Sequence, residues 1–153
     1  MAYENAREFL SRGVHWPAPE EGKVNIHWTT VREGSPKAFW NGRASGTVDE
    51  ALRNLAWAMR SPENKDFYVC MSSQSQYEQR TSKAGNTYLN AIRSSSNAMK
   101  FKSIFLDVDV KPNAYPDTVT AVTELGKFRR AAGLPRPTFI VASGSGGFHV
   151  HWV

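Results

Sequence analysis

The sequence predicts a mixed α/β protein in which an N-terminal α/β unit, residues 1–100, leads into a β-α-β-β unit, residues 101–153. Two observations predict this class. Apolar residues recur at strand spacing in several short segments and at helix spacing in others, and the two kinds of segment alternate along the chain. At 153 residues and 41% hydrophobic content the chain can bury a core of ordinary size, so we expect both units to belong to one domain.

Composition excludes several classes of protein. The single cysteine, Cys70, excludes an internal disulfide framework or a multi-cysteine zinc site within the chain. No apolar run has the length needed to cross a bilayer, and the first residues lack the order of a secretory signal, so we expect a cytoplasmic protein with no membrane partner. The net charge of +5 favours a polyanionic partner such as nucleic acid.

The N-terminal unit is expected to alternate short helices and strands. Val24, Ile26 and Trp28 alternate with polar residues, which is typical of a half-buried strand. Thr47, with Glu50 three residues later, is a good helix N-cap. We expect helices over 2–12 and from Thr47 to Ser61, strands over 24–29, 38–40 and 67–71, and a turn at Asn41-Gly42. The five tryptophans, Trp16, Trp28, Trp40, Trp57 and Trp152, are interpreted as packing residues.

Residues 72–100 differ in character, because they are rich in Ser, Asn, Gln and basic side chains and show little periodicity. We expect a mobile basic loop here. It is either a solvated linker or a segment that clamps nucleic acid or nucleotide. The basic residues that could contact template or phosphate are Arg80, Lys83, Arg93 and Lys100, with Lys111 further along the chain.

The C-terminal unit has the sharpest pattern. An apolar strand over 104–110 is interrupted only by Asp107 and Asp109, and a helix is expected over 117–132 with Gly133 as its C-terminal cap. Val122, Leu125 and Phe128 are expected to face inward. Strands are predicted over 137–142 and 148–153, joined by the glycine-rich loop 143–147.

Three side chains of this unit point to phosphate chemistry. Residues two apart on a strand share a face, so Asp107 and Asp109 are expected to lie close together, as a hard cation such as Mg²⁺ or Mn²⁺ requires. His149 follows a loop of small residues whose backbone N–H groups can approach an anion. In an RRM-like sheet the first and third strands are neighbours, which would bring the aspartates and His149 together.

These segments, FLDVDV around Asp107 and Asp109 and SGSGGFHVHW around His149, resemble motifs I and II of the archaeo-eukaryotic primase superfamily, in particular phage and plasmid primase-polymerases. The resemblance implies an RRM-like catalytic half and metal-dependent, template-directed nucleotidyl transfer from nucleoside triphosphates in phage, plasmid or prophage replication in a bacterial host cell. It implies that Asp107 and Asp109 bind Mg or Mn, that Ser143, Gly147 and His149 contact the triphosphate, and that DNA template and primer are partners.

The chain departs from the family pattern in one respect. Motif III, an apolar strand with a further aspartate, has no counterpart before Val153. We therefore expect a fragment of a longer protein, whose remainder completes the core and includes a helicase, or which works with a separate helicase. Two other interpretations are that another chain supplies the third carboxylate, or that the fragment is inactive.

Two further functions are compatible with the same residues. His149-Val150-His151 is also the His-hydrophobe-His signature of rolling-circle replication nickases, which hold one metal with the pair. That motif leaves the two aspartates unexplained. A basic RRM-like sheet would also suit a non-enzymatic nucleic-acid-binding module.

Overall fold

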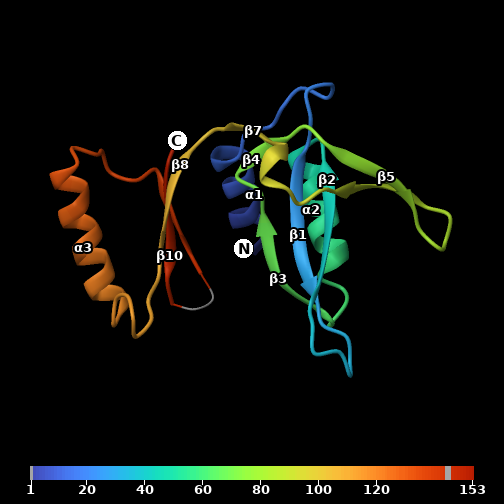
Figure 1. The fold of residues 1–153 in the computed structure, drawn as a ribbon. Coiled ribbons are helices and arrows are strands. Elements are labelled where there is room, and N and C mark those ends of the chain that lie inside the picture. Colours follow the sequence, from blue (N-terminus) through green and yellow to red (C-terminus); the bar gives the residue numbers. More distant parts are fainter. Residues whose placement is uncertain (1, 144–145) are drawn as a thin grey trace. The chain divides into compact units, whose positions relative to one another are not determined.

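A computed structural model describes residues 2–143 and 146–153. The chain divides into two compact units, residues 1–102 and 103–153, and each is described by itself (Figure 1). Both contain helices and antiparallel sheets, so the protein is of mixed α and β class, as predicted. Among the described residues, no helix combines the length and the apolar character that crossing a membrane requires.

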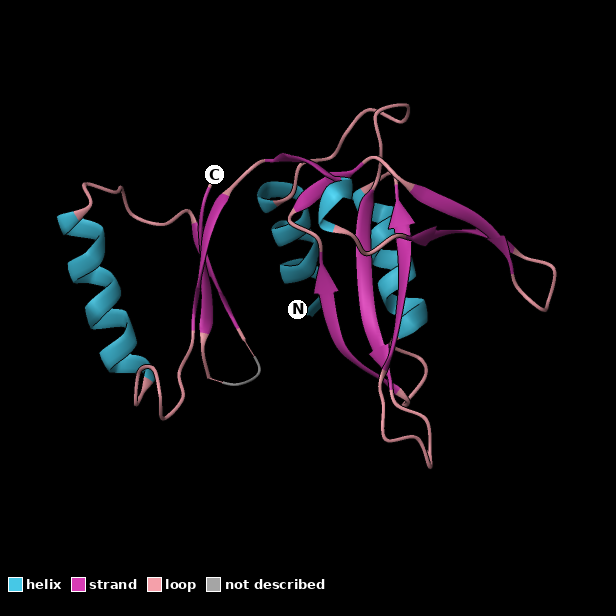
Figure 2. Cartoon of the chain, in the orientation of Figure 1, coloured by secondary structure: helices cyan, strands magenta, loops and turns pink. Residues whose placement is uncertain are grey.

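A three-stranded antiparallel sheet forms the centre of the first unit. Its order is β2-β1-β3, with β1 Val24–Thr30, β2 Phe39–Ser45 and β3 Asn64–Val69. Helices α1, Ala2–Gly13, and α2, Val48–Ala58, cover one face (Figure 2). As predicted, Thr47 caps α2: its hydroxyl accepts a hydrogen bond from the Glu50 N–H at 3.2 Å. The core under the helices includes Leu10, Val14, Val24, Ile26, Trp28 and Leu52.

The central strand β1 is buried on both faces, not on one as the alternation predicted. Val24, Ile26 and Trp28 belong to the core beneath the helices. Asn25 and His27, which point to the other face, are equally buried because later segments of the same unit, including β4 and β6, lie against β1. Side-chain polarity was therefore a poor guide to burial on this strand.

The expected turn at Asn41-Gly42 is also wrong, because β2 runs straight through it. A Cβ atom on Gly42 would lie 2.6 Å from His27 Nδ1 and 2.9 Å from Ala91 Cβ. This glycine therefore allows close approach within the sheet. The chain reverses earlier, in residues 31–38, where Gly34 has φ +74°.

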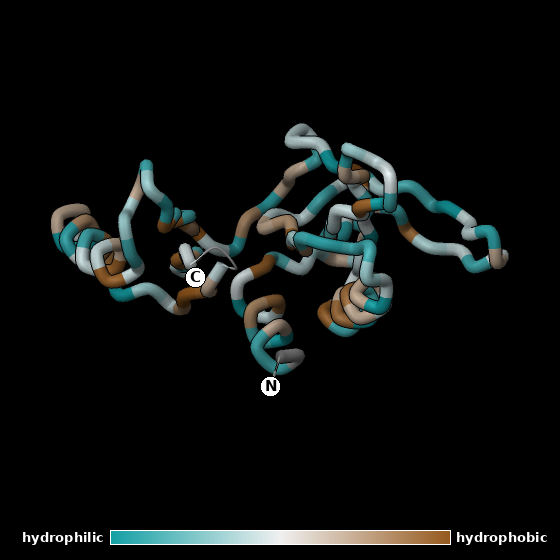
Figure 3. The backbone as a smooth tube through the Cα atoms, turned by 90° about the horizontal axis from the view of Figure 1, so that it is seen from below, coloured by the Kyte–Doolittle hydropathy of each residue, from teal (hydrophilic) through white to brown (hydrophobic). Residues whose placement is uncertain are grey.

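Residues 72–100 are not the predicted loop. They form β4 Ser72–Gln74, β5 Tyr77–Thr81, β6 Thr87–Ala91, the short 3₁₀ helix η1 Ser95–Asn97, and β7 Ala98–Phe101. Strand β4 pairs with β7, and β5 with β6 in a largely hydrophilic hairpin (Figure 3). The buried Asn97 side chain binds both the N–H and the carbonyl of Gln76, at 2.6 and 2.9 Å. Backbone pairing and a buried amide hold this segment, and neither produces apolar periodicity.

The second unit has the predicted order of elements. It consists of β8 Ile104–Val108, α3 Thr118–Ala131, β9 Phe139–Ala142 and β10 Phe148–Trp152. The sheet order is β8-β10-β9, so the aspartate strand lies beside the histidine strand as expected. Asp117 caps α3 by accepting from the Thr120 N–H at 2.7 Å, and Gly133 after the helix has φ +65°. The predicted ends of this helix are confirmed.

The helix contacts its sheet through only one of the three residues predicted to face inward, Leu125. The core of the second unit contains Val108, Ala121, Phe148 and Val150, and Leu125 packs against it. Val122 and Phe128, expected inward, are 50% and 49% exposed. Positions 121 and 125 are one helical turn apart and define the buried face. Val122 is turned about 100° from Ala121 and lies to the side of this face, whereas Phe128 lies in line with it, near the end of the helix at Ala131.

Candidate functional site

Asp107 and His149 lie directly opposite each other on neighbouring strands. The antiparallel register of β8 and β10 pairs these two residues, and His149 Nε2 lies 3.3 Å from Asp107 Oδ1. Both side chains are accessible, with 44% of His149 and 65% of Asp107 exposed. The apolar residues Val108 and Val150 point to the opposite face, against α3. The sheet therefore presents a carboxylate and an imidazole together to solvent.

Asp109 lies just beyond the end of β8, and its carboxylate pairs with the ammonium of Lys111. The Lys111 pKa is raised by its hydrogen bond to Asp109 and by the charge of Asp109, and also by the charge of Asp107. Both carboxylates thus act on one positive charge. The ammonium occupies a position in which a metal cation would be attracted by the same oxygens, so the donor set suits a hard divalent cation.

His151 is placed differently from His149, although the two residues share a face of β10. It is only 1% exposed, between the rings of Phe105 and Phe139, whose centroids lie 5.8 and 4.8 Å from its own. Burial, followed by the proximity of His149, lowers the pKa of His151. An imidazole packed between two phenyl rings is unsuited to sharing a metal with His149, which disfavours the His-hydrophobe-His interpretation.

Gly147 occupies a site with no space for a side chain. A Cβ atom there would lie 2.5 Å from the carbonyl oxygen of Val108 and 3.1 Å from Ser143 Oγ. The Ser143 N–H donates to the Gly147 carbonyl at 2.9 Å, so this N–H is used within the loop. Gly144 and Ser145, also part of the predicted loop, lie outside the described residues. Gly147 therefore has a structural role at the point where β10 meets the end of β8.

The five predicted basic residues are divided between the two units. Lys111 belongs to the second unit and contacts Asp109, whereas the other four lie in the first unit. Arg80 pairs with Glu78 at 2.6 Å and Lys100 with Glu21 at 3.6 Å, while Lys83 lies in the turn of the β5–β6 hairpin. Arg93 alone of these stacks on an aromatic ring, that of Trp40.

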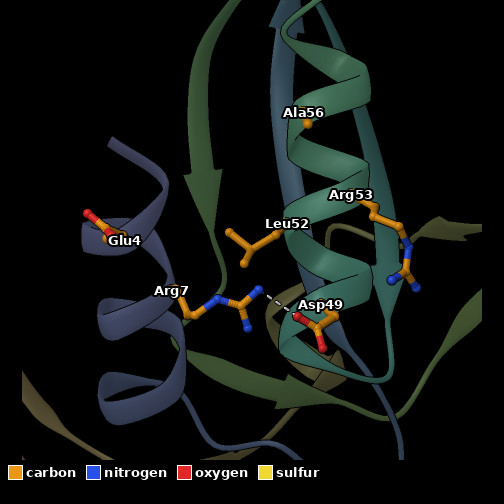
Figure 4. Close-up of a pocket in the computed structure, with 6 residues that line it drawn as sticks. All are labelled: Glu4, Arg7, Asp49, Leu52, Arg53 and Ala56. Carbon is orange, nitrogen blue, oxygen red and sulfur yellow. Dashed lines mark ion pairs between the residues drawn. The ribbon is translucent and has the colours of Figure 1, made fainter. Parts of the chain in front are cut away.

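A surface hollow lies between α1 and α2 of the first unit. It is lined by Glu4, Arg7, Asp49, Leu52, Arg53 and Ala56, with Arg7 and Asp49 paired at 2.7 Å (Figure 4). None of the predicted site residues borders it. Within the described part of the chain, no three His, Cys, Asp or Glu side chains are grouped closely enough to hold a metal ion.

Comparison of the chain with protein-family models, curated proteins and solved structures returned no match.

Proposed function

We propose that the chain carries the nucleotidyl-transfer centre of a DNA primase or DNA polymerase, with an RRM-like catalytic half. The observation that carries the proposal is the direct pairing of Asp107 with His149, beside Asp109. Two accessible carboxylates, one on the sheet and one just beyond its strand, and an accessible imidazole are the donor set that metal-dependent transfer of a nucleotide from a triphosphate needs.

The residues have separate roles in this proposal. Asp107 and Asp109 would hold Mg²⁺ or Mn²⁺, which neutralises charge on the triphosphate and polarises the phosphoryl group. His149 Nε2, now next to Asp107 Oδ1, can donate to a phosphate oxygen. Gly147 keeps β10 close to β8, so that the histidine and the carboxylates stay in register.

Calorimetric titration of a nucleoside triphosphate, with and without Mn²⁺, tests the proposal. Wild type should bind only with the metal, and both His149→Ala and the double variant Asp107→Ala, Asp109→Ala should lose binding. The double variant should remain folded, because both carboxylates are exposed and removing them relieves the repulsion between two neighbouring negative charges. Glu124→Gln, which changes an acidic residue on α3, is the control and should bind normally.

Two outcomes would contradict the proposal. Unchanged metal-dependent binding in the double variant would mean that the site is misassigned. Metal-dependent cleavage of single-stranded DNA, without triphosphate binding, would favour the nickase.

A further inference from the structure

The face of the β2-β1-β3 sheet that points away from the helices carries two accessible aromatic rings. Ile26 and Trp28 of β1 face the helices, so His27 and Thr29 face the other side. The register pairs Trp40 of β2 with Thr29 and Tyr68 of β3 with His27. Trp40 and Tyr68 therefore share this face, although β1 separates their strands.

These two rings, whose planes meet at 46°, form a small group with Arg93. The centroids of Trp40 and Tyr68 are 5.2 Å apart, and the Arg93 guanidinium lies 3.9 Å from the Trp40 centroid. Trp40 is 45% exposed and Tyr68 48% exposed, so large parts of both rings face solvent. Rings of this size are normally buried, and the exposed guanidinium that lies over the Trp40 ring adds a flat cationic group.

The residues beneath the group are closely packed. His27 is 4% exposed, and Gly42 lies so close to it that no Cβ fits between them. Burial lowers the pKa of His27, against the raising effect of a backbone hydrogen bond with Asn41, so the ring is neutral at pH 7. Rings held on a buried sheet lose little conformational entropy when a ligand stacks on them.

The segment that contributes Arg93 is basic, which favours an anionic ligand. Between Asp66 and Asp107 the only acidic residue is Glu78, which is paired with Arg80, and the basic residues of that stretch are Arg80, Lys83, Arg93, Lys100 and Lys102. Asp66 itself accepts a hydrogen bond from Thr29 at 3.1 Å.

We propose that Trp40, Tyr68 and Arg93 form a stacking surface for the bases of single-stranded nucleic acid. Unpaired bases expose flat π faces, which stack on aromatic rings and on guanidinium planes without regard to sequence, while nearby basic side chains attract the phosphates. Bases in a duplex are already stacked on one another, so the surface selects single strands. The surface lies in the first unit and requires no metal, so the inference goes beyond the proposed nucleotidyl transfer.

Fluorescence anisotropy with a labelled oligothymidylate, in EDTA and at low salt, tests the inference on the full chain. Tyr68→Ala and Arg93→Gln should each weaken binding, by about 5- to 100-fold for the loss of one stacked base. Tyr68→Phe keeps the ring and should bind as wild type does. A duplex of mixed sequence and equal length should bind more weakly than the single strand.

Matched controls separate stacking from general basicity and from folding defects. Phe128→Ala removes a ring that is 49% exposed in the other unit, and Arg53→Gln removes a charge from α2, on the helix side of the sheet. Both should leave binding unchanged, and circular dichroism should show that every variant is folded. The double variant Asp107→Ala, Asp109→Ala should still bind the oligonucleotide.

The inference is overturned if wild type does not bind the single strand in EDTA, or if Tyr68→Ala binds as tightly as Tyr68→Phe. Either result leaves the proposed triphosphate site untouched, because that site is measured with a different ligand and requires metal.

Discussion

Replacing Gly147 with alanine should destabilise the second unit even when no nucleotide is present. The new Cβ would lie 2.5 Å from the Val108 carbonyl oxygen, where ordinary contacts are 3.4 Å or longer, so the backbones would have to part by about 0.9 Å. Overpacking of this kind costs about 1–3 kcal/mol. The displaced carbonyl lies between Asp107 and Asp109, so the candidate site would be distorted as well.

Hydrogen–deuterium exchange in urea, followed by mass spectrometry, measures this loss separately in each unit. Peptides covering β8 and β10 should exchange faster in Gly147→Ala, and peptides covering β1 should be unchanged. Gly126→Ala is a matched control in α3, where the Cβ would make only an ordinary contact of 3.6 Å with Arg130. It should stabilise the unit by about 0.5–1 kcal/mol. Exchange in Gly147→Ala equal to or slower than wild type would refute the steric reasoning.

Three other predictions concern single groups. Thr47→Ala removes the α2 cap and should lower the stability of the first unit by about 1 kcal/mol, measured by urea unfolding, whereas Thr47→Ser should not. His27 has a folded-state pKa below its ordinary value of 6.5, chiefly through burial, so the unfolded chain takes up the extra proton. The first unit should therefore lose stability as pH falls below about 6.5 and down to the folded-state pKa, and His27→Gln should remove this part of the pH dependence. Lys111→Gln removes a cation that competes for Asp109 and should raise Mn²⁺ affinity in calorimetry; unchanged or weaker binding would contradict this.

Elements with local signals were predicted well from the sequence. The ends of α3 follow from Asp117 and Gly133, and the start of α2 follows from Thr47, because each acts on backbone groups within a few residues. The juxtaposition of Asp107 and His149 was also expected, because the sequence indicates which residues share a face of each strand and the order in which the strands and helix follow one another.

The errors arose where distant segments decide the structure. Gly42 indicated a turn, but its real constraint comes from His27 and Ala91, which a local pattern cannot show. Strand pairing of residues 72–100 depends on backbone hydrogen bonds and on the buried Asn97. Trp40 was interpreted as a packing residue, and the sheet register adds that it meets Tyr68 across β1. The sequence offered one indication of the proposed binding surface, which is the stretch around Arg93 that contains almost no acidic residues.

The two aspartates are held by different structures, although the sequence presents them as an equivalent pair. Asp107 lies within β8, where pairing with β10 fixes its backbone opposite His149. Asp109 lies outside the strand, before a turn in which the Lys111 N–H binds the Tyr115 carbonyl at 3.0 Å and the Ala114 N–H binds the Lys111 carbonyl at 2.9 Å. Changes in the turn should therefore move Asp109 while leaving Asp107 in register. If both carboxylates hold one cation, the distance between them is adjustable through residues 110–115, whereas the distance from Asp107 to His149 is set by the sheet.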